Sequence, residues 1–162
     1  MIELVVVVSI LALLSGVLAP RIREHVKGTR DAERLDDIMV LRRAIEQFYM
    51  DRGHFPAPTE NSKFSGWDVS QDGDFIAELV STGYLEEVPT DPLNTKQFHY
   101  RYYVYGPGEY GCKGNSPFYV LGIKAFENED FALRNHGFFR CETRDWSQEF
   151  AFVTGGGARL KR

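Results

Sequence analysis

The first third of the chain carries two apolar patterns in succession. Residues 4–19 are apolar apart from two serines and one glycine, and such a run predicts a helix that is hydrophobic on every face. In residues 21–52, apolar side chains recur at spacings of three and four, which predicts a helix with a single apolar stripe. Pro20 and Gly28 weaken a helix without always ending it, so we expect one rod over residues 1–52.

Residues 53–162 carry the signals of a globular head that mixes helix and strand. Residues 59–73 are polar and predict an irregular connection, and a short helix over 75–80 should follow, capped by Asp72 or Asp74. Three later segments have strand character, and their Gly- and Asn-rich connections favour antiparallel pairing: 98–105, 118–126 and 149–154. The expected fold class is therefore α+β, with a long N-terminal helix packed on a small antiparallel sheet.

Aromatic residues separate the first helix from the head, because every Phe, Tyr and Trp lies at or after Phe48. Four tyrosines fall in the first predicted strand, where we expect them to pack the sheet rather than to stack on nucleic-acid bases: Tyr100, Tyr102, Tyr103 and Tyr105. The glycines at 155–157 follow the last strand and predict a flexible end. The 43% apolar and 26% charged content exclude a wholly disordered chain.

The two cysteines exclude a disulfide-dense scaffold and a four-cysteine zinc site. Cys112 and Cys141 lie in the loops that follow the first and second predicted strands. If the head lies outside the cytoplasm, a disulfide between them is the favoured state, and two separate buried thiols are the alternative.

Charge and motif content exclude other classes of function. Residues 53–162 hold eleven basic and fifteen acidic side chains, and an acidic head is a poor partner for phosphate backbones. The basic C-terminal end is the exception, but such ends are usually only solvated, so nucleic-acid binding is not expected: Arg159, Lys161 and Arg162. The four histidines are scattered, and no HExxH, GxSxG or phosphate-binding loop is present. The sequence therefore predicts a protein that is not an enzyme.

The apolar run is a marginal membrane span, since 16 residues fall short of the roughly 20 that a spanning helix needs. A cleaved signal peptide fits badly, because no basic segment precedes the run and Pro20 follows the small residue where cleavage would occur. Basic side chains after the run favour leaving that end in the cytoplasm: Arg21, Arg23 and Lys27.

Glu3 is the one charge in the first twenty residues. A carboxylate inside an apolar span costs on the order of 3 kcal/mol, so it needs a partner or a proton. The alternative is a place at the helix end, where it meets the headgroup region and complements the helix dipole.

Taken in order, these segments resemble the type IV pilin and type II secretion pseudopilin family. The aliphatic segment, with its early Glu3 and with Pro20 seventeen residues later, is similar to the N-terminal helix of that family. Further segments resemble its helix exit, the loop before its sheet and its first strand: 30–38, 44–49, 51–56, 84–85, 88–92 and 98–102. Precursors of the family carry a short basic leader and a methylated residue after the cleavage site, and we expect both to lie upstream of Met1.

The resemblance implies a structural subunit of a type IV pilus-like filament, extracellular or periplasm-spanning. Residues 1–20 would form the transmembrane and then the filament-core helix, residues 21–52 its amphipathic continuation, and residues 53–162 the head. Glu3 would face the α-amino group of a neighbouring copy, and Pro20 would let the rod flex. A minor pseudopilin of a type II secretion system and an adhesive or DNA-uptake pilin are the alternatives.

The partners implied by the resemblance are other copies of the chain, an inner-membrane assembly platform and a prepilin peptidase. The chain would wait in the inner membrane with its head outside, opposite to the charge signal, and then enter an extracellular filament or a periplasmic pseudopilus. Major pseudopilins also carry an acidic calcium loop. Residues 127–130 offer oxygen ligands without a matching spacing, so we expect a solvated acidic turn there and no cofactor.

Overall fold

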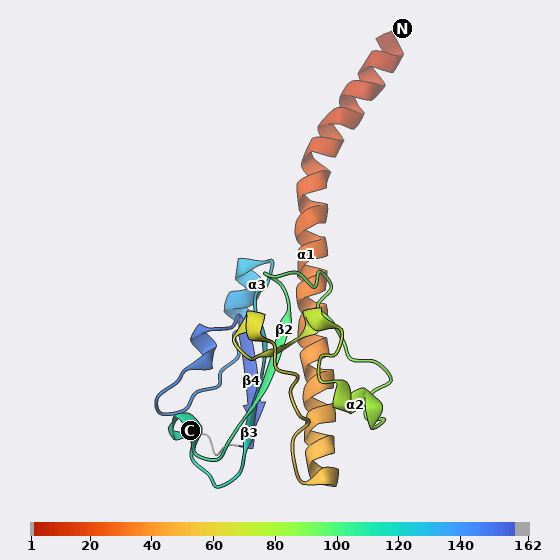
Figure 1. Cartoon of the computed structure of the whole chain (residues 1–162). Helices are drawn as coiled ribbons and strands as arrows, with labels where there is room; N and C mark the ends of the chain where they lie inside the picture. Colours follow the sequence, from red (N-terminus) through yellow and green to blue (C-terminus); the bar gives the residue numbers. More distant parts are fainter. Residues whose placement is uncertain (1, 158–162) are drawn as a thin grey trace.

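One helix runs through the first third of the molecule. The computed structural model describes residues 2–157, apart from the side chains of residues 13–20. Helix α1 (Ile2–Arg52) has 51 residues, about 76 Å at 1.5 Å per residue. It ends at Gly53, whose φ of 77° suits a residue without a Cβ atom and whose N–H bonds to the Tyr49 carbonyl at 2.9 Å. Figure 1 shows the first half of α1 standing clear of the head and the second half lying along it.

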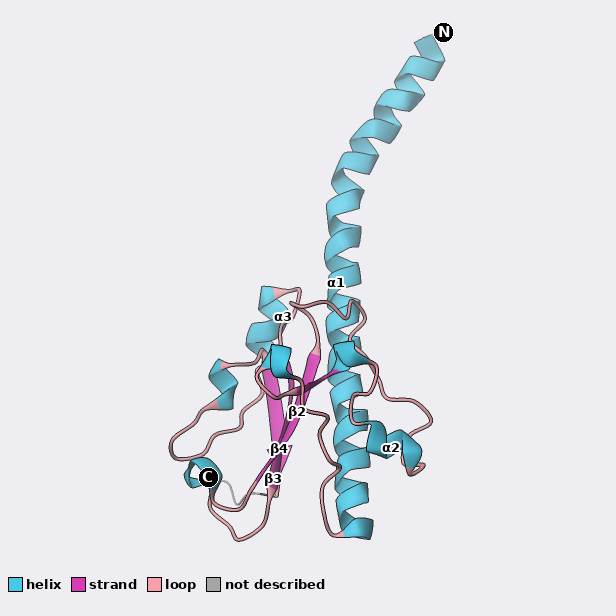
Figure 2. Cartoon of the chain, in the orientation of Figure 1, coloured by secondary structure: helices cyan, strands magenta, loops and turns pink. Residues whose placement is uncertain are grey.

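A four-stranded antiparallel sheet forms the centre of the head and lies beside the second half of α1 (Figure 2). Its strands follow the chain order, β1 (Asp68–Val69), β2 (Tyr100–Tyr105), β3 (Phe118–Ile123) and β4 (Phe152–Gly156). The three predicted strands are confirmed with shifted ends. The two-residue β1 was missed, because so short a strand leaves no alternation to recognise.

Two short helices flank the sheet, α2 (Ala77–Ser81) and α3 (Glu129–Arg134). The predicted cap of α2 is wrong, because Ile76 occupies that position at φ 42° and no side chain bonds there. Helix α3 replaces the predicted acidic turn, and the Asn128 side chain caps it by accepting from the Phe131 N–H at 2.9 Å. Four single turns of 3₁₀-helix complete the head: Ser62–Phe64, Ser70–Asp72, Glu109–Gly111 and Trp146–Gln148.

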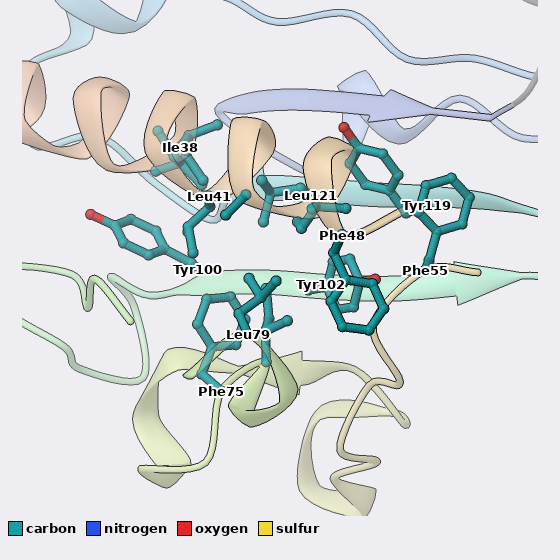
Figure 3. Close-up of a cluster of buried hydrophobic side chains, with 14 residues drawn as sticks. Ile38, Leu41, Phe48, Phe55, Phe75, Leu79, Tyr100, Tyr102, Tyr119 and Leu121 are labelled. Carbon is teal, nitrogen blue, oxygen red and sulfur yellow. The ribbon is translucent and has the colours of Figure 1, made fainter. Parts of the chain in front are cut away.

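The first core fills the space between α1 and the sheet. Figure 3 shows Ile38, Leu41 and Phe48 of α1 directed toward the β2 and β3 side chains. The tyrosines beneath the helix keep their hydroxyls bonded, Tyr100 to Asp37 at 2.7 Å and Tyr102 to the Pro56 carbonyl at 2.8 Å. The predicted stripe on the helix is therefore confirmed as its buried face.

The second core lies on the opposite face of the sheet, because alternate residues of β3 enter different clusters. It is strongly aromatic: Trp67, Tyr105, Phe118, Phe139, Trp146 and Phe150. Cys112 and Cys141 belong to this core and are joined in a disulfide, with Cα atoms 4.7 Å apart. The bridge ties the loop after β2 to the loop that precedes the turn at Trp146.

The glycines near the end of the chain do not form the predicted flexible end. Gly155 and Gly156 lie inside β4, paired with Val120 and Tyr119 of β3. A Cβ atom on Gly155 would lie 2.4 Å from the Tyr119 carbonyl oxygen and from the Phe139 ring. The sheet and the aromatic core approach so closely there that only glycine fits.

We expect Gly155→Ala to lower the free energy of unfolding by about 3 kcal/mol, because the backbone contact cannot yield. Gly28→Ala is the matched control, since a Cβ atom there meets nothing within 4 Å in the middle of α1. It should raise helix stability by about 1 kcal/mol. Urea unfolding of the purified chain measures both. Equal effects of the two substitutions would contradict the close approach at Gly155.

Candidate functional site

The protruding half of α1 exposes apolar side chains along its length. Ile2 is 81% exposed and Leu4 71% exposed, and every described side chain from residue 2 to residue 12 is exposed. In the part of the chain that the structure describes, no helix reaches the combined length and hydropathy of a membrane span. Exposed apolar surface of this kind is typical of protein–protein and membrane contact sites.

The predicted assembly residues lie on this helix and apart from the disulfide. Glu3 occupies the exposed first turn of α1. Pro20 lies within the continuous helical backbone, and its side chain is outside the described residues. The disulfide between Cys112 and Cys141 belongs to the head, which Figure 1 places away from the N-terminus. The structure therefore does not bring these residues into one site.

A buried ion network fastens α1 to the head where the helix leaves it. Arg34 is fully buried and donates to both carboxylate oxygens of Asp91, from Nε at 2.7 Å and from Nη2 at 3.1 Å. Its Nη1 donates to Asp31 at 2.6 Å and to Glu127 at 3.0 Å. The Phe98 ring covers the guanidinium, with its centre 5.1 Å from the Cζ atom. One side chain of the helix thus contacts two loops that are distant in sequence.

The carboxylates of the network also hold the backbone of these loops. Asp91 accepts from the N–H groups of Leu93 and Asn94, which fixes the turn before β2. Asp31 accepts from the N–H groups of Glu127 and Asn128, at the start of α3, at 3.0 and 2.9 Å. Buried carboxylates bonded in this way need no water to satisfy their oxygens.

Arg30 adds a second guanidinium at the rim of the network. It donates to both oxygens of Glu127, at 2.7 Å from Nε and 2.5 Å from Nη2. The bonds from Arg30 hold the pKa of Glu127 below its usual range. Burial opposes the charge of Arg34, but its bonds to Asp91 and Glu127 outweigh burial and raise its pKa. Two guanidiniums therefore face three carboxylates in this network.

The network also explains why the acidic segment 127–130 does not offer free metal ligands. Glu127 is bonded to Arg30 and Arg34, and Asn128 caps α3, so neither is a free oxygen ligand. Among the described residues, no three acidic, histidine or cysteine side chains converge in a way that could hold a metal ion.

The sequence did not predict this network. The only local signal was the three-residue spacing of Asp31 and Arg34 on one helix, which ordinarily forms a weak surface pair. The partners Asp91 and Glu127 lie 57 and 93 residues beyond Arg34. The stiff segment around Asp91, with a proline on either side, was recognised as a turn but not as a contact of the helix.

Asp68 and His99 are buried in the head, and Asp37 of α1 is partly buried against it. Burial raises the pKa of Asp68 to about 6, although the Thr59 and Ile76 N–H groups bond to its Oδ2. Burial likewise raises the pKa of Asp37 to about 6. Burial lowers the pKa of His99 to about 4, and Arg101 donates to its Nε2 at 2.9 Å, which requires the neutral ring.

We expect Arg34→Met to lower the free energy of unfolding by about 3–5 kcal/mol, because it leaves buried carboxylates without their partner. Arg34→Lys should recover only part of the loss, since an ammonium cannot bond both oxygens of Asp91. Arg42→Met is the control, because Arg42 forms an exposed pair with Glu46 and should change stability by less than about 0.5 kcal/mol. Chemical unfolding of the three variants measures these differences, and equal losses in Arg34→Met and Arg42→Met would contradict a structural role for the network.

The raised pKa of Asp68 makes its contribution to stability depend on pH. A folded-state pKa near 6, above the unfolded value of about 3.9, favours the folded state below pH 4, and this contribution is lost as pH rises through 6. Asp68→Asn keeps an oxygen for both N–H groups and cannot ionise. The difference between its free energy of unfolding and that of the original chain should therefore shift in favour of the variant by about 2 kcal/mol from pH 4 to pH 7. Urea unfolding at unit pH steps measures the difference, and a pH-independent difference would refute the assignment.

The lowered pKa of His99 makes the free energy of unfolding change with pH in the opposite direction over the same range. The neutral, buried imidazole stabilises the fold above pH 6.5, and this contribution is lost as the pH falls toward 4. The Asp68→Asn experiment compares two chains that both contain His99, so that contribution cancels in the difference.

The chain was compared with protein-family models, with characterised proteins and with solved structures. None of the three comparisons produced a match. The features of this chain that bear on its function are therefore its own: an exposed apolar half-helix, an early carboxylate and an ion network that anchors the helix to the head.

Proposed function

We propose that the chain is a structural subunit of a type IV pilus-like filament, assembled by side-by-side packing of its N-terminal helices. The observation that carries the proposal is the division of α1. Its first half stands clear of the head in Figure 1 and exposes apolar side chains over residues 2–12, while its second half is packed and anchored. Such a helix requires an apolar environment that the chain does not supply to itself.

Two environments can cover the exposed half, namely lipid and the same helix of other copies. Moving from one to the other gains little from the hydrophobic effect, because both are apolar. Close packing and polar pairs then decide the exchange. Glu3 supports this view, because a carboxylate in an apolar core needs a cation and the α-amino group of a neighbouring copy would provide one.

The ion network supports the same proposal from the side of the head. In a filament in which each head is attached to the core by a single helix, force passes through the junction between that helix and the head. Arg34 lies at that junction and connects the helix to the loops before β2 and α3. Buried, multiply bonded ions resist shear more than an apolar contact that can slide, because their bonds are directional.

Substitution of Glu3 tests the proposal. We expect Glu3→Leu and Glu3→Ala to abolish filaments while the protein still enters the membrane, because the apolar helix is kept and the charged pair is lost. Negative-stain microscopy of sheared surface material, with mass spectrometry of its subunits, measures assembly. Glu24→Ala is the control, because Glu24 forms an exposed pair with Lys27 on the same helix and should assemble normally.

Thin filaments that contain the chain, and that disappear in the Glu3 variants alone, would support the proposal. Filaments that persist in both Glu3 variants would exclude the role of Glu3. Absence of filaments from the original chain, with the protein left in the membrane fraction, would favour a minor pseudopilin. A soluble form cut after residue 19 would overturn the filament proposal as a whole.

A further inference from the structure

Two basic side chains, Arg101 and Lys124, lie close together on the face of the sheet that carries the second core. Arg101 is opposite Gly122 in the pairing of β2 with β3, and the N–H of Lys124 bonds to the His99 carbonyl at 3.0 Å, two residues further along the same ladder. Because side chains alternate between the faces, all four residues share one face, with the two cations at diagonal positions. Diagonal neighbours are about 7–8 Å apart, so two long side chains there can reach the same small ligand.

Aromatic rings border this pair of cations. The Cζ atom of Arg101 lies 5.6 Å from the centre of the Phe64 ring, and the Nζ atom of Lys124 lies 5.9 Å from the centre of the Phe150 ring. Phe150 lies against Gly122, where a Cβ atom would come within 2.6 Å of a ring carbon. Both cations are half-buried. Their attraction for an anion is therefore stronger than at an open surface, because apolar neighbours screen charge less than water does.

Neither cation forms a salt bridge within the described part of the chain. Arg101 donates from Nε to Nε2 of His99 at 2.9 Å, and its two Nη groups have no acceptor among the described residues. The Nζ of Lys124 donates to the Glu149 carbonyl at 2.8 Å. The Glu149 carboxylate acts on both cations through its charge, but its two oxygens are bonded to Arg144.

This arrangement differs from that of other arginines in contact with the head. Arg34 and Arg144 are each bonded to carboxylates. Burial lowers the pKa of Arg101 and that of Lys124, and the charge of Arg101 lowers the pKa of Lys124 further. Two like charges that are partly removed from water are unfavourable unless an anion accompanies them.

The pair lies at the end of the sheet that faces the protruding half of α1. Tyr100, at the start of β2, bonds to Asp37, whereas Tyr102 bonds to a carbonyl beyond the end of α1. Figure 1 shows β2 starting near α3, at the end of the head from which the first half of α1 emerges. If that half lies in a membrane, as the proposed function requires, Arg101 and Lys124 belong to the end of the head nearer the lipid headgroups.

We propose that Arg101 and Lys124 bind one phosphate group, with the Nη groups of Arg101 and the Nζ of Lys124 donating to its oxygens. A phosphate group fits two cations better than a carboxylate does, because it offers oxygens in more directions and can carry more than one negative charge. The site goes beyond the proposed filament function and does not depend on it. An anionic lipid headgroup and a soluble phosphate share this chemistry and are the two possible sources.

Titration of the purified full chain with inorganic phosphate, followed by calorimetry at an ionic strength held constant with sodium chloride, tests the site. Arg101→Gln and Lys124→Gln should each weaken the affinity at least tenfold, because each removes one of the two cations. Lys113→Gln is the matched control, since it removes the same charge from an exposed position in the loop after β2 and should change the affinity less than twofold.

Thermal unfolding distinguishes loss of binding from damage to the fold. Without phosphate, Lys124→Gln should unfold at the midpoint of the original chain or above it, because the substitution removes a repulsion. Phosphate should raise the midpoint of the original chain and of Lys113→Gln, but not that of Lys124→Gln. An equal rise with sodium chloride at the same ionic strength would overturn the inference. So would equal losses of affinity in Lys113→Gln and Lys124→Gln.

A second ligand identifies the source of the phosphate. Glycerophosphoglycerol is the water-soluble headgroup of phosphatidylglycerol and binds without insertion into a membrane. An affinity comparable to that of inorganic phosphate would support the site and assign it to a lipid headgroup. Inorganic phosphate that binds at least tenfold tighter would support the site and assign it to a soluble phosphate. If the original chain binds neither ligand, the site is wrong, and the filament proposal is unaffected because its test concerns Glu3.

Discussion

The buried guanidinium of Arg34 is the constraint on which the arrangement of this molecule depends. A charge so far from water is tolerable only when every donor has a partner, and here the donors reach Asp31 on the same helix and Asp91 and Glu127 on two separate loops. Those carboxylates in turn bind backbone N–H groups of the loops. Rotation or sliding of the helix would break several of these bonds at once. The position of α1 on the head is therefore specified by directional bonds as well as by apolar contact.

Away from this point, the helix and the sheet are held by apolar packing that is less specific in direction. Tyrosines from β2 and β3 lie under α1, and each keeps its hydroxyl bonded while its ring is buried. On the far side of the sheet, an aromatic core with a disulfide at its edge holds the long loops. The sheet thus has two buried faces although it contains only four strands. This is why β3 is buried at every residue instead of at every second one.

The same helix serves the head and, in the function we propose, the neighbouring copies. Its inner face carries Ile38, Leu41 and Ile45, whereas Met39 and Val40 are exposed on its outer face. Apolar packing against neighbours supplies cohesion but little specificity of register, since one aliphatic surface fits another at several offsets. Charged pairs do discriminate between offsets, because a displaced register leaves like charges together. In the proposed assembly, Glu3 would have that role at the start of the helix.

The sequence by itself determined the long helix, its buried stripe, the three main strands and their antiparallel pairing. These features depend on periodicity and turn residues within a few positions of one another. Only the tertiary structure decided the ion network, the pairing of Gly155 with β3 and the conversion of an acidic segment into a capped helix at Asn128. The ion network and the Gly155 pairing join residues that are distant in the chain, and at the start of α3 the N–H groups of Glu127 and Asn128 bond to Asp31, 96 and 97 residues away, besides the local cap by Asn128. A solvated charge and a buried, bonded charge look identical in a sequence, and folding alone distinguishes them by removing water from one of the two.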